Sequence, residues 1–281
     1  MSLDRRTMLG GGVMLASGGA AKAAPRRVAS LNACLDAMLV HLADRSQIAA
    51  LSHYAREAHS STVAAQARTL PFTWESAEEI IALEPDLVLS SKHSALATRN
   101  ALKRLKVPVE RFAVPKSIDQ SLAQVRRVAG LIGHPERGAA LVVRIRAAIA
   151  DATPPAGSRR LTALIYQPNG FAAGPGTLVD EMMARAGFDN VARRYGLRTW
   201  GNVSLETLLA DPPQVLLVGE PAPGARSWAD RVMTHPALKS IAGRMRQVRV
   251  PEKVLYCGGP VLIEAAAALA HGRRQALKEG A

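Results

Sequence analysis

The sequence predicts an α/β protein with two Rossmann-like, doubly wound lobes that are joined by a single rigid α-helix. Short apolar runs alternate with helical segments over residues 26–116 and again over 158–281, and residues 117–152 between them show no strand signal. Strands and helices that alternate at these lengths imply crossover connections and mostly parallel sheets. A chain of 281 residues is long enough for two lobes that each bury a core.

The first lobe, residues 26–116, contains four strand-like and three helix-like runs. The expected strands are Val28–Leu31, Ile48–Leu51, Asp86–Ser90 and Val107–Val114, and the expected helices are Leu35–Leu42, Ser76–Leu83 and Ala95–Leu105. The second of these helices begins with Ser76-Ala-Glu-Glu79, a pattern typical of a capping box, and Pro85 ends it.

The connection between the lobes, residues 117–152, is predicted to be helical. Gly133-His134-Pro135 interrupts it and leaves a helix over Glu136–Ala150, which we expect to bridge the lobes. A linker over 153–157 follows, and the second lobe, residues 158–281, then repeats the alternation. Its expected elements are Leu161–Tyr166, Leu178–Ala186, Leu205–Ala210, Val215–Val218, Val248–Val250 and Val261–Ala270.

Residues 1–23 are typical of a secretory signal peptide of the twin-arginine type. Arg5 and Arg6 precede a small, apolar run, Met8–Ala21, and Ala21-Lys22-Ala23 fits an A-x-A cleavage pattern. The run is too short and too rich in glycine to span a bilayer, which takes ~20 apolar residues. We therefore expect cleavage near Ala23/Ala24 and a soluble, periplasmic product that does not span the membrane.

The composition excludes several function classes. A net charge of +13 favours anionic partners, but the chain has no basic stripe with interleaved aromatic residues, so we expect no nucleic-acid partner. No CxxC, HxxxH or HExxH occurs, so we expect no protein-built metal site. We also expect no cofactor, because no glycine-rich nucleotide loop follows a strand. No GxSxG elbow is present either, which argues against an enzyme.

The only two cysteines, Cys34 and Cys257, fall on strand-to-helix loops of opposite lobes. An oxidising compartment permits a single disulfide between them. Such a bridge across the cleft would hinder opening, so we expect two separate buried thiols. A disulfide and a soft metal site are the alternatives.

Several segments carry a resemblance to a known family. Glu78–Ser90 contains the pattern E-x-I-x-A-L-x-P-D-L-V, Pro175–Glu181 is followed by A-G-F-D-N-V, and Val203–Glu206 precedes a second strand-like run. With Arg27–Leu31 and Cys257–Pro260, these pieces in this order resemble class III solute-binding proteins, which bind cobalamin or iron–siderophores for ABC importers. The resemblance covers nearly the whole chain after the signal peptide.

The resemblance implies a ligand cleft between the lobes and a set of cleft residues. In open α/β sheets ligands lie beyond the carboxyl ends of the strands, and aromatic faces suit macrocycles and catecholate rings. Trp200 stands six residues before Glu206, the spacing of a cleft tryptophan in cobalamin-binding members. The residues expected to bind ligand are Trp200, Tyr54, Phe171, Trp74 and Tyr256. Phe72 is an alternative to Trp74.

Glu78 and Glu206 match the pair of glutamates, one per lobe, with which the family docks onto the permease. Their alternative role is to stabilise the first turn of a helix. We expect the histidines nearest the cleft, His53, His59 and His93, to have surface or loop roles. The basic candidates for the cleft are Arg56, Arg68, Arg99, Arg193, Arg194 and Arg198, most of them expected on a solvated surface.

The resemblance therefore predicts a monomeric binding protein without enzymatic activity. It would bind a metal chelate, an iron–siderophore in preference to cobalamin or another corrinoid, and deliver it to an ABC permease with its ATPase. A secreted sensor or adaptor and an uncharacterised α/β enzyme are the alternatives.

Overall fold

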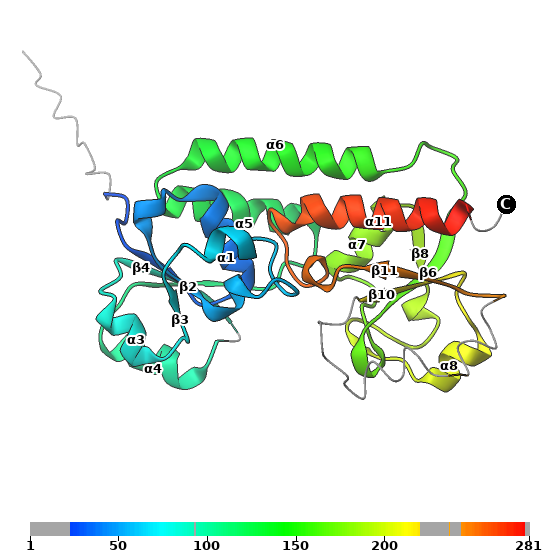
Figure 1. The fold of residues 1–281 in the computed structure, drawn as a ribbon, viewed down its shortest axis with the longest axis horizontal. Helices are drawn as coiled ribbons and strands as arrows, with labels where there is room; N and C mark the ends of the chain where they lie inside the picture. Colours follow the sequence, from blue (N-terminus) through cyan, green and yellow to red (C-terminus); the bar gives the residue numbers. More distant parts are fainter. Residues whose placement is uncertain (1–22, 93, 220–235, 237–242, 279–281) are drawn as a thin grey trace, which may run out of the picture.

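The computed structural model describes residues 23–92, 94–219, 236 and 243–278, and it shows two α/β lobes side by side beneath a long helix (Figure 1). The first lobe is built on a five-stranded sheet in the order β3-β2-β1-β4-β5, and every pairing in it is parallel. This is the order of a doubly wound sheet, in which the chain reverses between β1 and β4. The strands are β1 (Val28–Ser30), β2 (Ile48–Ser52), β3 (Phe72–Thr73), β4 (Leu87–Ser91) and β5 (Val109–Phe112).

Helices connect these strands as crossovers. They are α1 (Ala33–Leu42), α2 (Ala64–Ala67), α3 (Ala77–Ala82) and α4 (Leu96–Arg104), with the 3₁₀ turns η1 (Arg45–Gln47) and η2 (His53–Arg56). The predicted elements of this lobe are confirmed to within about two residues at most ends, the ordinary uncertainty of element boundaries. The structure adds the two-residue β3 and the short α2, which are too brief to give a periodic signal.

The second lobe has a mixed sheet. Its central path runs β11-β10-β6-β7-β9, and β8 also pairs with β6. The strands β10, β6, β8 and β11 are parallel, whereas β7 and β9 are antiparallel to their neighbours. The strands are β6 (Leu161–Tyr166), β7 (Phe171–Ala172), β8 (Phe188–Asn190), β9 (Gly201–Asn202), β10 (Val215–Gly219) and β11 (Arg246–Val250). The lobe also contains η3 (Pro168–Gly170), α7 (Leu178–Arg185), η4 (Val191–Arg193), α8 (Leu205–Ala210), η5 (Glu252–Val254) and α11 (Val261–Lys278).

Two helices join the lobes. The chain leaves the first sheet through α5 (Ile118–Leu131), turns at Gly133 and enters α6 (Pro135–Ala152). One half of α6 packs on α5 and the other half on α11, so this helix spans both lobes (Figure 1). The predicted bridging helix is confirmed, with one extra residue at its start and two at its end.

The lobes share one hydrophobic core. A single cluster of buried side chains includes Met38 of α1, Val125 of α5, Ile145 of α6 and Val261 of α11. Two polar contacts reinforce this seam. Ser121 Oγ accepts a buried hydrogen bond from Gly259 N at 2.7 Å, and the half-buried Glu181 accepts one from Ile118 N at 2.8 Å. A shared core and paired polar groups resist relative motion of the lobes.

Gly259 shows how closely the two lobes approach each other. Its φ is +66°, in the left-handed region that favours glycine. A Cβ atom at this position would also lie only 2.9 Å from the terminal methyl of Met38 in the other lobe. A larger residue would adopt a strained backbone and would force the Met38 side chain to shift.

Cys34 and Cys257 form a disulfide bond, so the expectation of two separate thiols was wrong. Cys34 lies in the first turn of α1, and Cys257 lies just before α11. The expectation failed because it assumed that the cleft opens between these two loops. They instead meet beside the shared core, where the distance between the lobes is already fixed by packing.

This arrangement predicts that the disulfide contributes substantially to stability. We expect the Cys34→Ser/Cys257→Ser variant to lose about 2–5 kcal/mol of unfolding free energy, because the bridge constrains a very long loop of the unfolded chain. Denaturant unfolding of the variant and the parent protein measures the difference. Added reductant should destabilise the parent and leave the variant unchanged, and equal stability of the two proteins would contradict the prediction.

Candidate ligand-binding site

A cavity of about 470 Å³ lies between the loop that ends the first lobe and the helix layer of the second lobe. Its floor is apolar and its rim is polar and aromatic. The buried side chains of the floor are Leu178, Met182, Leu262, Ala265 and Leu269. The rim includes Lys116, Arg198, Trp200 and Tyr256. The volume falls in the range of small-molecule sites, which is roughly 300–1,000 Å³.

Trp200 and Phe171 form one aromatic pair at this rim. Their rings are stacked with centroids 5.2 Å apart and an interplanar angle of 8°. The antiparallel pairing of β7 with β9 brings the two residues together, because Phe171 starts β7 and Trp200 immediately precedes β9. Gly174 permits this approach, since a Cβ there would collide with the carbonyl oxygen of Thr199.

Tyr256 stands at the same rim beside the disulfide. Its hydroxyl lies 2.6 Å from Glu252 Oε1 and 2.7 Å from Gln167 Oε1. Burial and the neighbouring carboxylate of Glu252 raise the pKa of Tyr256 well above its usual value. The phenol therefore stays protonated and acts as a hydrogen-bonding wall of the cavity.

A second aromatic group lies in the first lobe, at the carboxyl ends of β2 and β3. Ser52 and Thr73 are register partners in these parallel strands, so the residues that follow them, His53 and Trp74, are neighbours. The two rings are stacked with centroids 4.7 Å apart, and the Tyr54 ring lies 3.8 Å from His53. Trp74 is 65% exposed and Tyr54 44% exposed, so both present aromatic surface to solvent.

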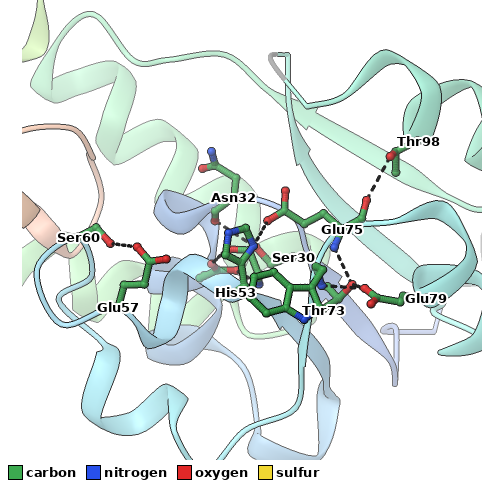
Figure 2. A network of polar contacts seen from close by, with 12 residues as sticks. Ser30, Asn32, His53, Glu57, Ser60, Thr73, Glu75, Glu79 and Thr98 are labelled. Carbon is green, nitrogen blue, oxygen red and sulfur yellow. Dashed lines mark hydrogen bonds and ion pairs between the residues drawn. The ribbon is translucent and has the colours of Figure 1, made fainter.

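Glu75 completes this group. Its Oε1 lies 3.2 Å from His53 Nδ1, and Figure 2 shows the two side chains directed at each other. The backbone of Glu75 has a φ of 70°, an unfavourable conformation for this residue type. Thr73 Oγ1 accepts from Glu75 N at 2.9 Å and Thr98 Oγ1 donates to Glu75 O at 3.1 Å, which holds the conformation. Burial raises the pKa of Glu75 against the opposing attraction of His53.

The predicted capping box is only half formed, and its other half supports this loop. Ser76 Oγ accepts from Glu79 N, as predicted. The Glu79 carboxylate, however, accepts hydrogen bonds from Thr73 Oγ1 at 2.6 Å and from Trp74 N at 2.7 Å (Figure 2). Glu79 thereby fixes the backbone that carries Trp74 and Glu75.

Asp36 lies buried beneath this group on α1. Its carboxylate accepts hydrogen bonds from Ser52 Oγ at 2.5 Å and Ser52 N at 3.1 Å. Burial raises the pKa of Asp36 to about 7, although the hydrogen bonds from Ser30 and Ser52 oppose the shift. The Asp36 carboxyl therefore connects the start of α1 to the end of β2, after which His53 follows.

Glu78 and Glu206 occupy equivalent positions in the two lobes. Each is the second residue of a short helix, α3 or α8, whose N-cap serine accepts from a backbone N–H of the first turn. Both side chains are exposed, and α3 and α8 lie on the side of the molecule opposite α6, one in each lobe (Figure 1). Hydrogen bonds from its own backbone and from Ser204 lower the pKa of Glu206, so it is charged.

The predicted site residues thus fall into two groups. Trp200 and Tyr256 line the cavity and Phe171 stacks on Trp200, whereas Tyr54 and Trp74 lie in the first-lobe group. Phe72, the alternative to Trp74, makes an edge contact with that ring. The disulfide links the first lobe to the cavity, because Cys34 lies at the start of α1 and Cys257 lines the cavity.

Most of the basic and histidine candidates lie away from the cavity. Arg56 packs over Phe72, Arg99 binds the carbonyl of Lys92, and Arg194 pairs with Asp211, while Arg68 and Arg193 are exposed. Arg198 alone among the candidate arginines lines the cavity. His59 pairs with Glu57 at 3.8 Å, and His93 lies outside the described residues.

Sequence reasoning missed Lys116, and it did not connect His53 with Glu75. The available signal was the pairing of strand ends: His53-Tyr54 and Trp74-Glu75 each follow a strand, and those strands are neighbours. Across the described residues, no group of three or more His, Cys, Asp or Glu side chains is placed to hold a metal ion. None of the described helices is both long and apolar enough for a membrane span.

A family model for periplasmic binding proteins matches residues 28–253. The chain belongs to the periplasmic binding protein family. The members that match it structurally are class III solute-binding proteins, which bind ligands for ABC transporters and are not enzymes. No curated protein matches the sequence.

Solved structures of such proteins share the fold. The apo periplasmic haem-binding protein RhuT of Roseiflexus sp. RS-1 superposes with a TM-score of 0.73 and 27% identity, over 89% of this chain and 98% of that one. An ABC-type Fe³⁺-hydroxamate transport protein of Saccharomonospora viridis gives 0.68 and 20%, over 89% and 93%. The vitamin B12-binding protein BtuF of Vibrio cholerae gives 0.64 and 16%, over 90% and 98%. The last two likenesses concern the fold alone.

The buried carboxyl of Asp36 predicts a specific pH dependence of stability. Its pKa rises from 3.8 in the unfolded chain to about 7 in the fold, so between these values only the native state retains the proton. This group's contribution to stability is therefore complete below pH 4 and is lost as pH rises through 7, by up to about 1.4 kcal/mol per pH unit. Asp36→Asn cannot ionise and should lose that dependence.

Unfolding free energies of both proteins at several pH values between 4 and 8 test this expectation. Asp119→Asn, which removes an exposed carboxyl at the start of α5, is the matched control. The Asp36→Asn variant should gain stability relative to the parent as pH rises, whereas the control should not. Parallel pH profiles of parent and Asp36→Asn would contradict the assignment.

Proposed function

We propose that this protein is the solute-binding component of an ABC importer and that it carries a metal chelate through the periplasm. The observation that supports this most directly is Trp200, which lines the 470 Å³ cavity and stacks on the partly exposed ring of Phe171. Stacked, partly exposed aromatic faces beside an apolar pocket suit a large, flat organic ligand, since they supply contact area with little loss of entropy.

The charges at the rim further define the ligand. Lys116 and Arg198 line the cavity, and neither forms an ion pair with another described residue. Cations at the mouth of an apolar pocket attract carboxylate or other anionic groups of a ligand. Haem, iron–siderophores and corrinoids combine flat or cyclic organic surface with anionic or amide groups. The likeness to a haem-binding protein at 27% identity supports haem as a further candidate next to the iron–siderophore that the sequence favoured.

We also propose that the mature protein acts as a periplasmic monomer. The proposal includes the signal peptide at 1–23, of which residues 1–22 lie outside the described residues, together with its twin-arginine type and its cleavage near Ala23/Ala24. The same proposal includes the division of the chain into a first lobe at 26–116, a helical connection at 117–152 and a second lobe at 158–281. Support for a periplasmic location comes from membership of the family.

Trp200 should anchor the ligand. We expect Trp200→Ala to weaken binding by at least about 1 kcal/mol, roughly fivefold, because it removes one face of the stacked pair. Calorimetric titration with ferric haemin, a ferric tris-hydroxamate and cobalamin measures the affinities. Tyr195→Phe, which alters an aromatic residue outside the cavity lining, should bind like the parent. Unchanged affinity of Trp200→Ala for every ligand that the parent binds would remove Trp200 from the site.

Glu78 and Glu206 should dock the loaded protein onto the permease. One carboxylate on each lobe, both on the face opposite α6, gives a two-point contact with a two-subunit channel. We expect Glu78→Ala/Glu206→Ala to bind ligand normally but to fail to stimulate the importer's ATPase in reconstituted vesicles. Each single change should have a smaller, salt-dependent effect.

The matched control is Asp119→Ala/Glu136→Ala, which removes two exposed carboxylates from the α5–α6 side. It should support transport like the parent. If the two glutamates only stabilise helix starts, their double variant should melt earlier yet transport normally once folded. Normal uptake by the folded double variant would therefore disprove docking.

A further inference from the structure

We propose that the apolar floor of the cavity binds a hydrocarbon arm of the ligand, and that the ligand is an anionic, amphiphilic metal chelate. This inference rests on the proposed function and narrows its substrate class. It selects a chelate that carries an alkyl or acyl substituent together with a carboxylate, over a chelate whose whole surface is polar.

Two neighbouring helices build the floor, and each turns one apolar stripe toward it. Helix α11 contributes Leu262, Ala265 and Leu269, and α7 contributes Leu178 and Met182. Residues spaced by three or four positions lie on the same face of a helix, so each set forms one stripe. Helix α7 packs beside α11 in the second lobe (Figure 1), and the two stripes therefore bound one common space.

A small residue in the middle of the α11 stripe leaves this space open. Ala265 is only 4% exposed and stands about one turn from Leu262 and one turn from Leu269. Its side chain ends at Cβ, so this position does not fill the hollow between α11 and α7. Protein interiors are otherwise packed, with few voids larger than a water molecule. A hollow lined by leucine and methionine side chains favours an apolar occupant over water.

The chemistry of the floor excludes the charged part of a chelate. None of its side chains carries a nitrogen or oxygen atom. A hydroxamate, a carboxylate or a bound metal ion placed there would lose its hydration without gaining a hydrogen bond, which is strongly unfavourable. A hydrocarbon arm gains free energy on the same transfer, in proportion to the apolar area removed from water. The chelated metal therefore stays at the rim near Trp200, and the arm points inward.

The rim supplies the charge that complements an anion. Lys116 comes from the end of the first lobe and Arg198 from the loop before β9. Both side chains are exposed, and the described residues that line the cavity include no Asp or Glu. Exposed cations pair with an anion and keep much of their hydration, so they suit a carboxylate that remains at the mouth. Cations above an apolar floor fit an amphiphilic anion.

Straight-chain carboxylates test the floor without any metal. From hexanoate through octanoate to decanoate, we expect the affinity of the parent protein to rise about fourfold for each added CH₂ group until the floor is filled. Calorimetric titration measures the affinities, and binding should show a negative heat-capacity change. Equal affinities along the series would mean that the floor stays empty and would overturn the inference.

The charges at the rim are tested with a chain that lacks the carboxylate. Octanol should bind about fivefold more weakly than octanoate at low salt. Lys116→Gln/Arg198→Gln should remove this difference while keeping the gain with chain length. A preference for octanoate that persists in this double variant would contradict the role of the two cations.

Two variants change the size of the floor in opposite directions. Ala265→Leu should fill the hollow and abolish the gain with chain length, whereas Leu269→Ala should enlarge it and extend the gain to longer chains. Ala267→Leu makes the first change at an exposed position of the same helix and should resemble the parent. Thermal melts establish which variants fold, and Leu269→Ala decides the question if Ala265→Leu does not. A parent-like series in either folded variant would place the arm outside the floor.

An acylated chelate extends the test to a metal-loaded ligand. A ferric tris-hydroxamate whose terminal amine carries a decanoyl group should bind more than about tenfold more tightly than its acetyl form, and decanoate should compete with it. If the parent binds any chelate but gains nothing from the longer chain, the inference fails and the transport role stands. If it binds none, ferric haemin and cobalamin included, the proposed function itself fails.

Discussion

The fixed distance between the two lobes is the constraint on which the rest of the structure depends. Helix α6 packs on α5 of one lobe and α11 of the other, and buried side chains of both lobes form one continuous core. The disulfide and the Ser121–Gly259 hydrogen bond lie along the same seam. Opening the lobes widely would break this packing and strain the bridge. Ligand entry must therefore depend on side chains and loops at the edges of the strands.

Those edges are placed by the topology of the sheets. In the first lobe, parallel β2 and β3 end in register, which brings His53 next to Trp74. In the second lobe, antiparallel β7 and β9 bring Phe171 next to Trp200. Each lobe thus has one aromatic pair, which parallel strands bring together in the first lobe and antiparallel strands in the second. The cavity adds an apolar floor, with Lys116 at its rim from the end of the first lobe and Arg198 from the second lobe.

The sequence predicted the elements well because their signals are local. The strand Leu161–Tyr166 and the helix Leu205–Ala210 match the structure residue for residue, since apolar periodicity and an N-cap serine mark them. The aromatic candidates came from a family resemblance, and the structure gathers them into two groups. The disulfide and the His53–Glu75 contact could not be predicted in this way. The disulfide depends on how the two lobes pack together, and the His53–Glu75 contact depends on how the neighbouring ends of β2 and β3 align.

The buried polar groups show how the first-lobe site is supported. Asp36 binds the strand end before His53, and Glu79 binds the strand end before Trp74. Each carboxylate accepts a backbone N–H together with a hydroxyl, so removing either would leave donors unpaired inside the lobe. Asp36 is buried and Glu79 is half-buried, so both acids act inside the lobe and not as a solvent-exposed ion pair. The structure keeps them where two strand ends must stay aligned, and this alignment is what places an imidazole, an indole and a carboxylate within contact of one another.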